Sequence, residues 1–215
     1  QRRRPHPRRD GLAVLGPASG AFYYMVVEAK RVARSCQPGQ FVIVRTDERA
    51  ERIPLTICDY DREKGLVTIV IQTIGNSTKE LCNYEVGDYF HDFVGPLGNP
   101  SDFIHENIDE LKKKNILFVA GGLGTAPVYP QVKWLHENGV NVDVIIGAKN
   151  KEAVIMEEEM KKVAKDVYVT TDDGSYGYKG PVTDVLKDLV QVQGKKYDVV
   201  VAIGPMIMMK FVSIL

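Results

Sequence analysis

Four short, almost wholly apolar segments recur in the second half of the chain, and segments of helical character separate them. The apolar segments are residues 115–120, 140–146, 167–171 and 197–203, and the helical ones are residues 128–138, 153–165 and 182–192. Strands that are buried on both faces and alternate with helices are typical of a doubly wound α/β domain with a parallel sheet. A ligand of such a domain binds at the carboxyl ends of its strands.

The first half of the chain has a different pattern. Short segments rich in β-branched and aromatic residues, bounded by turn signals, cover residues 22–28, 41–45, 53–58, 66–73 and 89–94. They predict a small antiparallel β-barrel. Two prolines and two glycines within residues 95–100 predict that neither a strand nor a helix continues there. We therefore expect a basic tail over residues 1–18, a β-barrel over 19–101, a linker helix over 102–114 and the α/β domain over 115–215.

Charge and cysteine content exclude several classes of protein. Five arginines and one aspartate give the first ten residues a charge of +4, so the remainder of the neutral chain carries −4. A nucleic-acid partner is not expected, because the folded body of such a protein would be basic. Cys36, Cys58 and Cys82 form no CxxC motif, which argues against a disulfide framework and a thiolate metal site and favours a cytoplasmic protein. The uncharged stretch of residues 11–27 holds too many Gly and Pro residues for a membrane-spanning helix.

The sequence GGLGTAP, residues 121–127, follows the first apolar segment and precedes the first helical one. Glycines at such a place let the backbone turn tightly and approach a diphosphate, and the first N–H groups of the following helix face the anion. The fingerprint of standard Rossmann dehydrogenases has a glycine where Pro127 stands, which argues against that class. A glycine-rich turn without a ligand is the structural alternative. The candidate dinucleotide-binding residues of this loop are Gly121, Gly122, Gly124, Thr125 and Ala126.

Three further loops follow apolar segments of the predicted sheet, so they are expected at the same edge. An NAD site commonly has an acidic residue after the second strand, for the ribose hydroxyls. Here Lys149 and Lys151 come first, and they favour a 2′-phosphate and hence NADP. Solvated loop lysines without a function are the alternative. The candidate residues of the three loops are Gly147, Ala148, Lys149, Asp173, Gly204, Pro205 and Met206.

Taken together, these segments resemble the ferredoxin–NADP reductase superfamily over about residues 20–212. Its members combine an FAD-binding β-barrel with a C-terminal NAD(P)-binding domain, and the resemblance implies that fold and those cofactors here. The most similar branch contains the electron-transfer subunit of dihydroorotate dehydrogenase B. It also contains the small subunit of NADH-dependent ferredoxin:NADP oxidoreductase, which is also called sulfide dehydrogenase.

The resemblance implies an FAD site in the β-barrel. The Thr56 hydroxyl would lie near flavin N5, and Thr56 is the expected catalytic residue. Two positions depart from the superfamily: Ile53 stands where it has an arginine, and Leu55 where many relatives have a tyrosine that stacks on the ring. Arg52 comes one place early, and a shift of one residue turns a strand side chain to the other face. The implied FAD-binding residues are Arg52, Pro54, Leu55, Thr56, Val70, Ile71, Gln72, Gly75, Ser77 and Thr78.

The resemblance further implies an FAD-containing electron-transfer subunit of a heteromer. NAD(P)H would deliver a hydride to the flavin, and electrons would pass to a catalytic flavoprotein or iron–sulfur subunit, with ferredoxin as a further candidate partner. Relatives hold a [2Fe–2S] cluster in a cysteine-rich C-terminal extension, whose ligands are absent from this chain. The apolar residues 206–215 are typical of a helix that is cut off, so we expect a truncated chain. We also expect the first 18 residues to lack the family's opening strand.

Two other functions fit the same residues. One is a stand-alone NAD(P)H–flavin or ferredoxin reductase. The other is a non-enzymatic, nucleotide-binding regulatory subunit whose flavin site has decayed, and the Ile53 departure is its main support. The presence of Thr56, Ser77 and Thr78 favours the enzyme. Bleaching of flavin absorbance by NAD(P)H would exclude the regulatory subunit.

Overall fold

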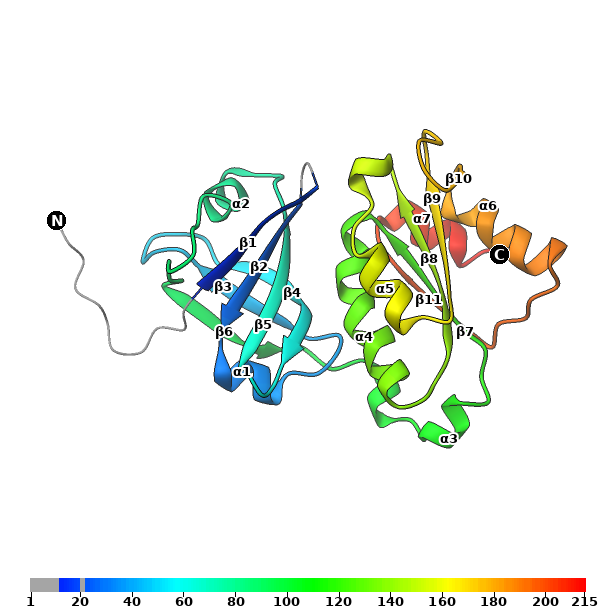
Figure 1. The fold of residues 1–215 in the computed structure, drawn as a ribbon, viewed down its shortest axis with the longest axis horizontal. Helices are drawn as coiled ribbons and strands as arrows, with labels where there is room; N and C mark the ends of the chain where they lie inside the picture. Colours follow the sequence, from blue (N-terminus) through cyan, green and yellow to red (C-terminus); the bar gives the residue numbers. More distant parts are fainter. Residues whose placement is uncertain (1–11, 20–21) are drawn as a thin grey trace. The chain divides into compact units, whose positions relative to one another are not determined.

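The computed structural model describes residues 12–19 and 22–215. These residues form two compact units, each built on its own sheet, and the chain passes from one to the other between Asn99 and Pro100 (Figure 1). The predicted fold class, an antiparallel β-domain followed by a parallel α/β domain, is confirmed.

The N-terminal unit contains a six-stranded sheet with the strand order β1-β2-β5-β4-β3-β6. Antiparallel pairing joins β2 to β5, β5 to β4, β4 to β3 and β3 to β6. Apolar side chains from four of the strands and both helices form one core, which includes Met25, Val44, Ile69 and Leu81. The elements are β1 (Leu12–Ser19), β2 (Phe22–Glu28), α1 (Lys30–Ser35), β3 (Phe41–Arg45), β4 (Ile53–Asp61), β5 (Leu66–Gln72), α2 (Asn76–Leu81) and β6 (Asp92–Leu97).

Two predictions for this unit are wrong, and both concern edge strands. The expected basic tail over residues 1–18 includes β1, so the opening strand is present; residues 1–11 lie outside the described part of the chain. The predicted break at residues 95–100 is a continuation of β6 through Gly95 and Pro96. Both β1 and β6 lie at an edge of the sheet, where a proline removes no hydrogen bond that a neighbour needs. Glycine is required at 95, because a Cβ atom there would lie 2.7 Å from Cγ1 of Val42.

The C-terminal unit contains a five-stranded parallel sheet with the strand order β10-β9-β8-β7-β11. The strands are β7 (Ile116–Gly121), β8 (Val142–Ala148), β9 (Asp166–Thr171), β10 (Tyr178–Lys179) and β11 (Val199–Ile203). The α-helices are α3 (Ile108–Leu111), α4 (Thr125–Glu137), α5 (Glu157–Val163), α6 (Val182–Lys187) and α7 (Met206–Val212). Short 3₁₀ turns cover Asp102–His105, Gly122–Gly124 and Lys151–Ala153, and a π-helical turn, Asp188–Val192, extends α6.

The expected linker helix over residues 102–114 is two short pieces instead of one helix. A 3₁₀ turn ends at His105, and α3 starts only after Asn107. The Asn107 side chain accepts a hydrogen bond of 2.8 Å from the Asp109 N–H, which caps α3. Side chains of this kind start a new helix at the residue that follows them.

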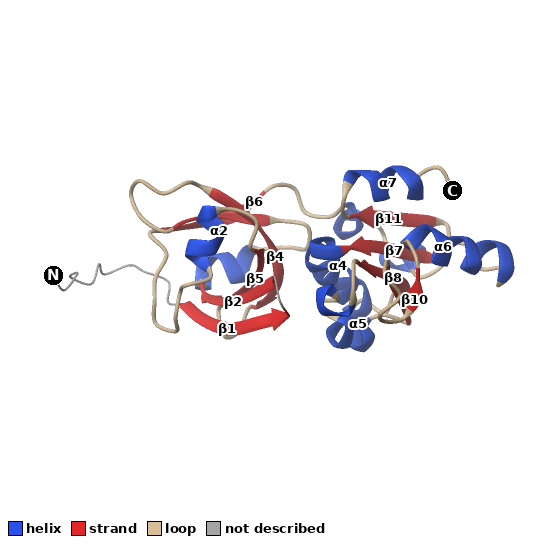
Figure 2. Cartoon of the chain, turned by 90° about the horizontal axis from the view of Figure 1, so that it is seen from above, coloured by secondary structure: helices blue, strands red, loops and turns tan. Residues whose placement is uncertain are grey.

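Helices cover both faces of the parallel sheet. Leu117, Val119 and Ile145 pack against α6 and α7, while Phe118 points to the opposite face. The helices α4 and α5 lie side by side, as do α6 and α7 (Figures 1 and 2). This arrangement buries β7 completely and leaves only its carboxyl end, with those of its neighbours, to face a ligand.

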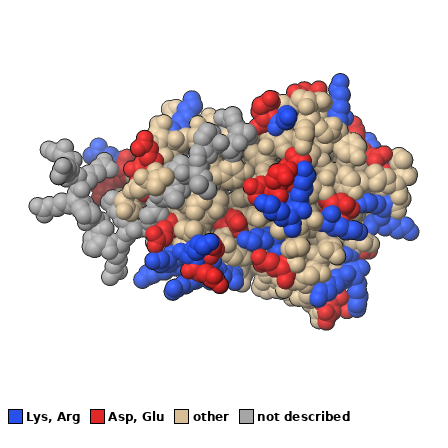
Figure 3. Space-filling view, viewed as in Figure 1, with Lys and Arg blue, Asp and Glu red and all other residues tan. Residues whose placement is uncertain are grey.

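The described surface has mixed charge. On the face that Figure 3 shows, acidic and basic side chains are interspersed over both units, and many form local pairs such as Lys161–Glu157, at 2.7 Å. Among residues 12–19 and 22–215, no helix is long and apolar enough to cross a membrane.

Candidate functional site

The carboxyl ends of β7 and β11 come together, and glycines make this approach possible. A Cβ atom on Gly124 would overlap the carbonyl oxygen of Ile203 and lie 3.0 Å from Cα of Gly204. A Cβ atom on Gly121 would lie 2.5 Å from Sδ of Met208. The loops that follow β7 and β11 are therefore in direct contact, as the sequence predicted for one edge of the sheet.

The start of α4 has two features that fit an anionic group. Thr125, its first residue, is fully buried, and its Oγ1 atom has no hydrogen-bond partner among the described residues. Gly122 has a φ of +55° and open space where a side chain would point. The free N–H groups of a thirteen-residue helix and its dipole favour negative charge at this end. Ala126 is buried, whereas Leu123 and Pro127 of the same loop are half-buried.

The loops after β8 and β9 are tied to each other. The backbone N–H of Asp172 donates to the carbonyl of Ala148 at 3.0 Å, and that of Asp173 to the carbonyl of Lys149 at 3.3 Å. The Ser175 hydroxyl accepts from the Lys151 N–H at 2.8 Å and donates to Asp173 at 2.7 Å. Hydrogen bonds from the side chain and the backbone of Ser175 lower the pKa of the Asp173 carboxyl.

These loops place the candidate residues in different environments. Lys149 is exposed, and the loop that carries Asp172 and Asp173 after β9 is hydrogen-bonded to its loop, at the same edge of the sheet as the sequence predicted. Gly147 has a packing role, because a Cβ atom there would overlap Cγ1 of Val182. Lys151 lies over the ring of Tyr176, at 5.5 Å from its centre. Pro205 and Met206 are exposed at the start of α7, and Met206 is 81% exposed.

In the N-terminal unit, the candidate flavin residues of β4 alternate between its two faces. Ile53 and Leu55 pack against the core, whereas Pro54 is exposed and Thr56 is half-buried. Arg52 is exposed, so it shares the outer face with Pro54. Leu55, which stands where a stacking tyrosine was expected, therefore contributes mainly to the core.

The strands β4 and β5 part close to these residues. β4 pairs with β5 as far as Ile57, opposite Ile69, and then pairs with β3 from Thr56 to Ile53. Along its other edge β5 stays paired with β2 up to Gln72. The side chains of the candidate residues Val70 and Ile71 are buried in the core, so only their backbone can reach a ligand, whereas Gln72 is half-buried.

The loop before α2 holds the last three candidates, and its hydroxyl groups are already bonded. Thr78 Oγ1 accepts from the N–H groups of Ile74 and Gly75, at 3.1 and 3.0 Å, and donates to the Gly75 carbonyl at 2.9 Å. Thr78 therefore closes the loop and caps the helix. The Ser77 hydroxyl donates to Oε2 of Glu51 at 2.6 Å. Glu51 was not among the sequence candidates, because only the fold brings it to Ser77.

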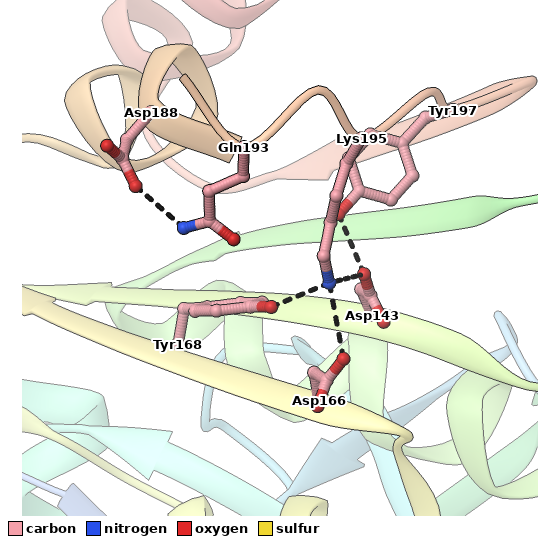
Figure 4. A network of polar contacts seen from close by, with 7 residues as sticks. All are labelled: Asp143, Asp166, Tyr168, Asp188, Gln193, Lys195 and Tyr197. Carbon is pink, nitrogen blue, oxygen red and sulfur yellow. Dashed lines mark hydrogen bonds and ion pairs between the residues drawn. The ribbon is translucent and has the colours of Figure 1, made fainter. Parts of the chain in front are cut away.

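Sequence reasoning also missed a charged network at the opposite, amino-terminal edge of the parallel sheet (Figure 4). Nζ of Lys195 lies 2.9 Å from Asp143, 3.2 Å from Asp166 and 2.7 Å from the Tyr168 hydroxyl. The Tyr197 hydroxyl donates to Asp143 at 2.7 Å. Burial disfavours the charged form of Lys195, but these hydrogen bonds outweigh it and raise the pKa of the amine. The network lies at the edge of the sheet opposite the candidate dinucleotide site, and it links the segment before β11 to β8 and β9.

The described cysteines have no geometry of a metal site. Cys36, Cys58 and Cys82 form no disulfide bond with one another, and burial raises the pKa of Cys36 to about 11. Among the residues that the structure describes, no group of three His, Cys, Asp or Glu side chains could hold a metal ion.

Comparisons with known proteins agree with this geometry. Residues 118–213 match the family described as "Oxidoreductase NAD-binding domain". The chain is 63% identical over 193 residues to a Clostridium beijerinckii protein described as "Uncharacterized protein in adh 3'region", covering 90% of this chain and 65% of that protein. It is 43% identical over 188 residues to the "Dihydroorotate dehydrogenase B (NAD(+)), electron transfer subunit homolog" of Thermotoga maritima, covering 87% of this chain and 63% of that protein.

Two further matches extend over more of the relative. The dihydroorotate dehydrogenase B (NAD(+)) electron transfer subunit of Fusobacterium nucleatum is 35% identical, with 87% of this chain and 71% of that protein covered. The solved structure of an NADH-dependent reduced ferredoxin–NADP oxidoreductase superposes with a TM-score of 0.84 at 37% identity, covering 98% of this chain and 72% of that one. The chain spans less than two thirds of the length of the Clostridium and Thermotoga relatives. By these matches and by its fold, the chain belongs to the family of the dihydroorotate dehydrogenase B electron-transfer subunits, within the ferredoxin reductase-like superfamily.

Proposed function

We propose that this chain binds FAD in its N-terminal unit and a nicotinamide dinucleotide in its C-terminal unit. As the electron-transfer subunit of a heteromer, it would carry electrons between NAD(P)H and an iron–sulfur partner. The observation that carries the proposal is the backbone surface at the ends of β7 and β11, with the buried, unpartnered hydroxyl of Thr125 at the start of α4.

The residues of the C-terminal unit fit a dinucleotide. Gly122 leaves open space beside backbone N–H groups, so a diphosphate can approach closely. Successive strands are added on opposite sides of β7, since β8 and β9 lie on one side of it and β11 on the other. Dinucleotides lie across such a turning point, so one half would contact the loops that carry Lys149 and Asp173, and the other half Pro205 and Met206.

The residues of the N-terminal unit fit a flavin. The pairing of β4 with β5 ends at Ile57 and Ile69, so residues 70–72 of β5 pair with β2 along one edge and with no residue of β4 along the other. Thr56 is the next residue of β4 beyond this pairing. Thr56 would donate to the ring, and Pro54 and Gln72 would border it. FAD, when bound, would supply the chemistry of accepting a hydride and releasing single electrons. The task of the chain is then to hold two flat rings in position, for which no general acid or base is needed.

The partner and the final acceptor follow from the family rather than from the described residues. Relatives are named electron transfer subunits, and one structure belongs to a reduced ferredoxin–NADP oxidoreductase. A catalytic flavoprotein, an iron–sulfur subunit or ferredoxin is therefore the expected partner. The regulatory-subunit alternative depends on Ile53, and a flavin that accepts electrons from NAD(P)H would exclude it.

The test starts with the visible spectrum of the purified chain after incubation with FAD and removal of the excess. Retained flavin bands and release of FAD by acid are expected. Anaerobic addition of NADH or NADPH should then bleach the flavin absorbance. A chain that retains no FAD would contradict the flavin part of the proposal, and dinucleotide binding without bleaching would favour the regulatory subunit.

A further inference from the structure

Two exposed lysines follow β8, and the structure gives their amines different surroundings. Nζ of Lys151 lies 5.5 Å from the centre of the Tyr176 ring. A cation within about 6 Å of an aromatic ring centre is attracted by the electrons of the ring face. The amine of Lys149 has no ring and no carboxylate as a partner among the described residues. The protein therefore holds one of the two positive charges and leaves the other free.

The backbone of Lys151 is fixed to the loop after β9. Its N–H group donates to the Ser175 hydroxyl at 2.8 Å, and that hydroxyl donates to the Asp173 carboxylate at 2.7 Å. The next residue of this loop is Tyr176. Because the backbone cannot shift, the direction of the long, flexible lysine side chain decides where its charge lies.

The Tyr176 ring is held from two sides. Its backbone N–H donates to Oγ1 of Thr171 at 3.0 Å, and the same Oγ1 donates to the Tyr176 carbonyl at 2.7 Å. Thr171 is the fully buried last residue of β9. The Tyr176 hydroxyl donates at 3.0 Å to Glu157, the first residue of α5, and Lys161 contacts the same carboxylate at 2.7 Å. The ring therefore has a fixed position, and it draws the Lys151 amine toward α5.

We propose that Tyr176 is a specificity-determining residue, which acts through Lys151 and disfavours NADP(H) relative to NAD(H). This inference rests on the proposed dinucleotide function of the C-terminal unit. The 2′-phosphate is the group that NADPH has and NADH lacks. The Lys151 amine must leave the ring before it can pair with that phosphate, so the energy of the cation–π contact is lost from NADPH binding. The exposed amine of Lys149 remains available to the phosphate.

The test is a calorimetric titration of the full chain, after incubation with FAD, with NADP+ and NAD+, because the oxidised forms transfer no hydride to the flavin. Tyr176→Leu should tighten NADP+ binding about twofold to fivefold relative to NAD+ binding, the range expected for an exposed cation–π contact. Tyr176→Phe keeps the ring and should keep the wild-type ratio of the two affinities. Lys151→Gln should leave that ratio unchanged in the wild type but abolish the gain in the Tyr176→Leu background.

Tyr178→Leu is the matched control, because this exposed tyrosine of the same loop has no lysine over its ring within the described part of the chain. It should leave the ratio unchanged. An equal change of both affinities in Tyr176→Leu would show a structural role only and overturn the proposal, and so would weaker NADP+ binding relative to NAD+. Lys151→Gln in the wild type tests the proposal with the tyrosine in place, and a selective loss of NADP+ binding of more than about threefold would overturn it. A wild-type chain that binds neither dinucleotide would overturn the proposed dinucleotide function itself, and the inference with it.

Discussion

Neighbouring glycines in the loop after β7 serve different purposes. Gly124 has no room for a methyl group, because the carbonyl of Ile203 occupies that position. Gly122 has open space, and what requires glycine there is its φ of +55°. Packing of the β7 and β11 ends therefore explains one glycine, and the approach of a ligand, together with the turn, explains the other.

This difference predicts that alanine at position 124 mainly lowers stability and alanine at position 122 mainly weakens dinucleotide binding. Gly124→Ala should destabilise the C-terminal unit by about 1–3 kcal/mol through overpacking. Gly122→Ala should cost only about 1 kcal/mol of backbone strain but should weaken dinucleotide binding more than tenfold, because its methyl group occupies the approach path. Thermal unfolding and NADH titration measure the two effects. Gly122→Ala with unchanged NADH affinity would contradict the site.

Lys149 tests the choice between the two nicotinamide dinucleotides. Its exposed amine would attract a 2′-phosphate, while the nearby Asp173 carboxylate would suit a ribose diol. Lys149→Glu should weaken NADPH binding by about 1–2 kcal/mol and NADH binding much less, because only NADPH carries the extra charge. Titrations with both dinucleotides, and with Lys162→Glu on α5 as the control, measure this. Equal loss for the two would remove the basis for an NADP preference.

At the scale of elements, the buried parallel strands were predicted better than the edge strands. The largely apolar segments that became β7, β8 and β9 indicate strands, because short runs of this kind between helical segments are typical of a parallel sheet covered on both faces. The strands β1 and β6 contain Gly-Pro pairs, which are turn signals unless the fold places the strand at an edge. The two-residue β10 depends on pairing with β9 and has no pattern of its own.

The candidate site divides in the same way. The glycine loops were predicted, because consecutive residues carry their signal. Glu51 beside Ser77 and Lys195 between two aspartates were not, because these partners are far apart in the sequence and only the fold brings them together.

The Lys195 network predicts a stability effect without an effect on binding. The segment before β11 is tied through Lys195 to β8 and β9, and the Asp143 side chain is only 8% exposed. Lys195→Met should leave this carboxylate buried with one partner fewer and destabilise the C-terminal unit by about 2 kcal/mol, less than for a fully buried pair because Lys195 is partly exposed. Lys196→Met, at the exposed neighbour, is the control for chemical denaturation. Equal loss in both variants would contradict the role of the network.

The same network predicts a loss of stability at high pH. The pKa of Lys195 is raised by its hydrogen bonds, and that of Tyr197 by burial and by Asp143. Above roughly pH 10 the unfolded chain releases protons from these groups that the folded chain retains, so the free energy of unfolding falls as the pH rises. Chemical denaturation between about pH 9 and 11 should show the free energy of unfolding falling more steeply with pH for the wild type than for Lys195→Met. The same fall with pH in both proteins would show that the raised pKa values do not contribute to stability.

At the scale of the whole molecule, the two units have separate cores and separate candidate ligands. Each ligand should therefore stabilise only the unit that binds it. At 100 times its Kd a ligand adds about 2.7 kcal/mol, which raises the Tm of a unit of this size by roughly 10 °C or more. FAD should raise the Tm of the transition of the N-terminal unit, and a nicotinamide dinucleotide that of the C-terminal unit. Lys195→Met should lower the Tm of the C-terminal unit alone. A single transition that both ligands shift would show that the units unfold together, and it would mean that the Lys195 network stabilises the flavin unit as well.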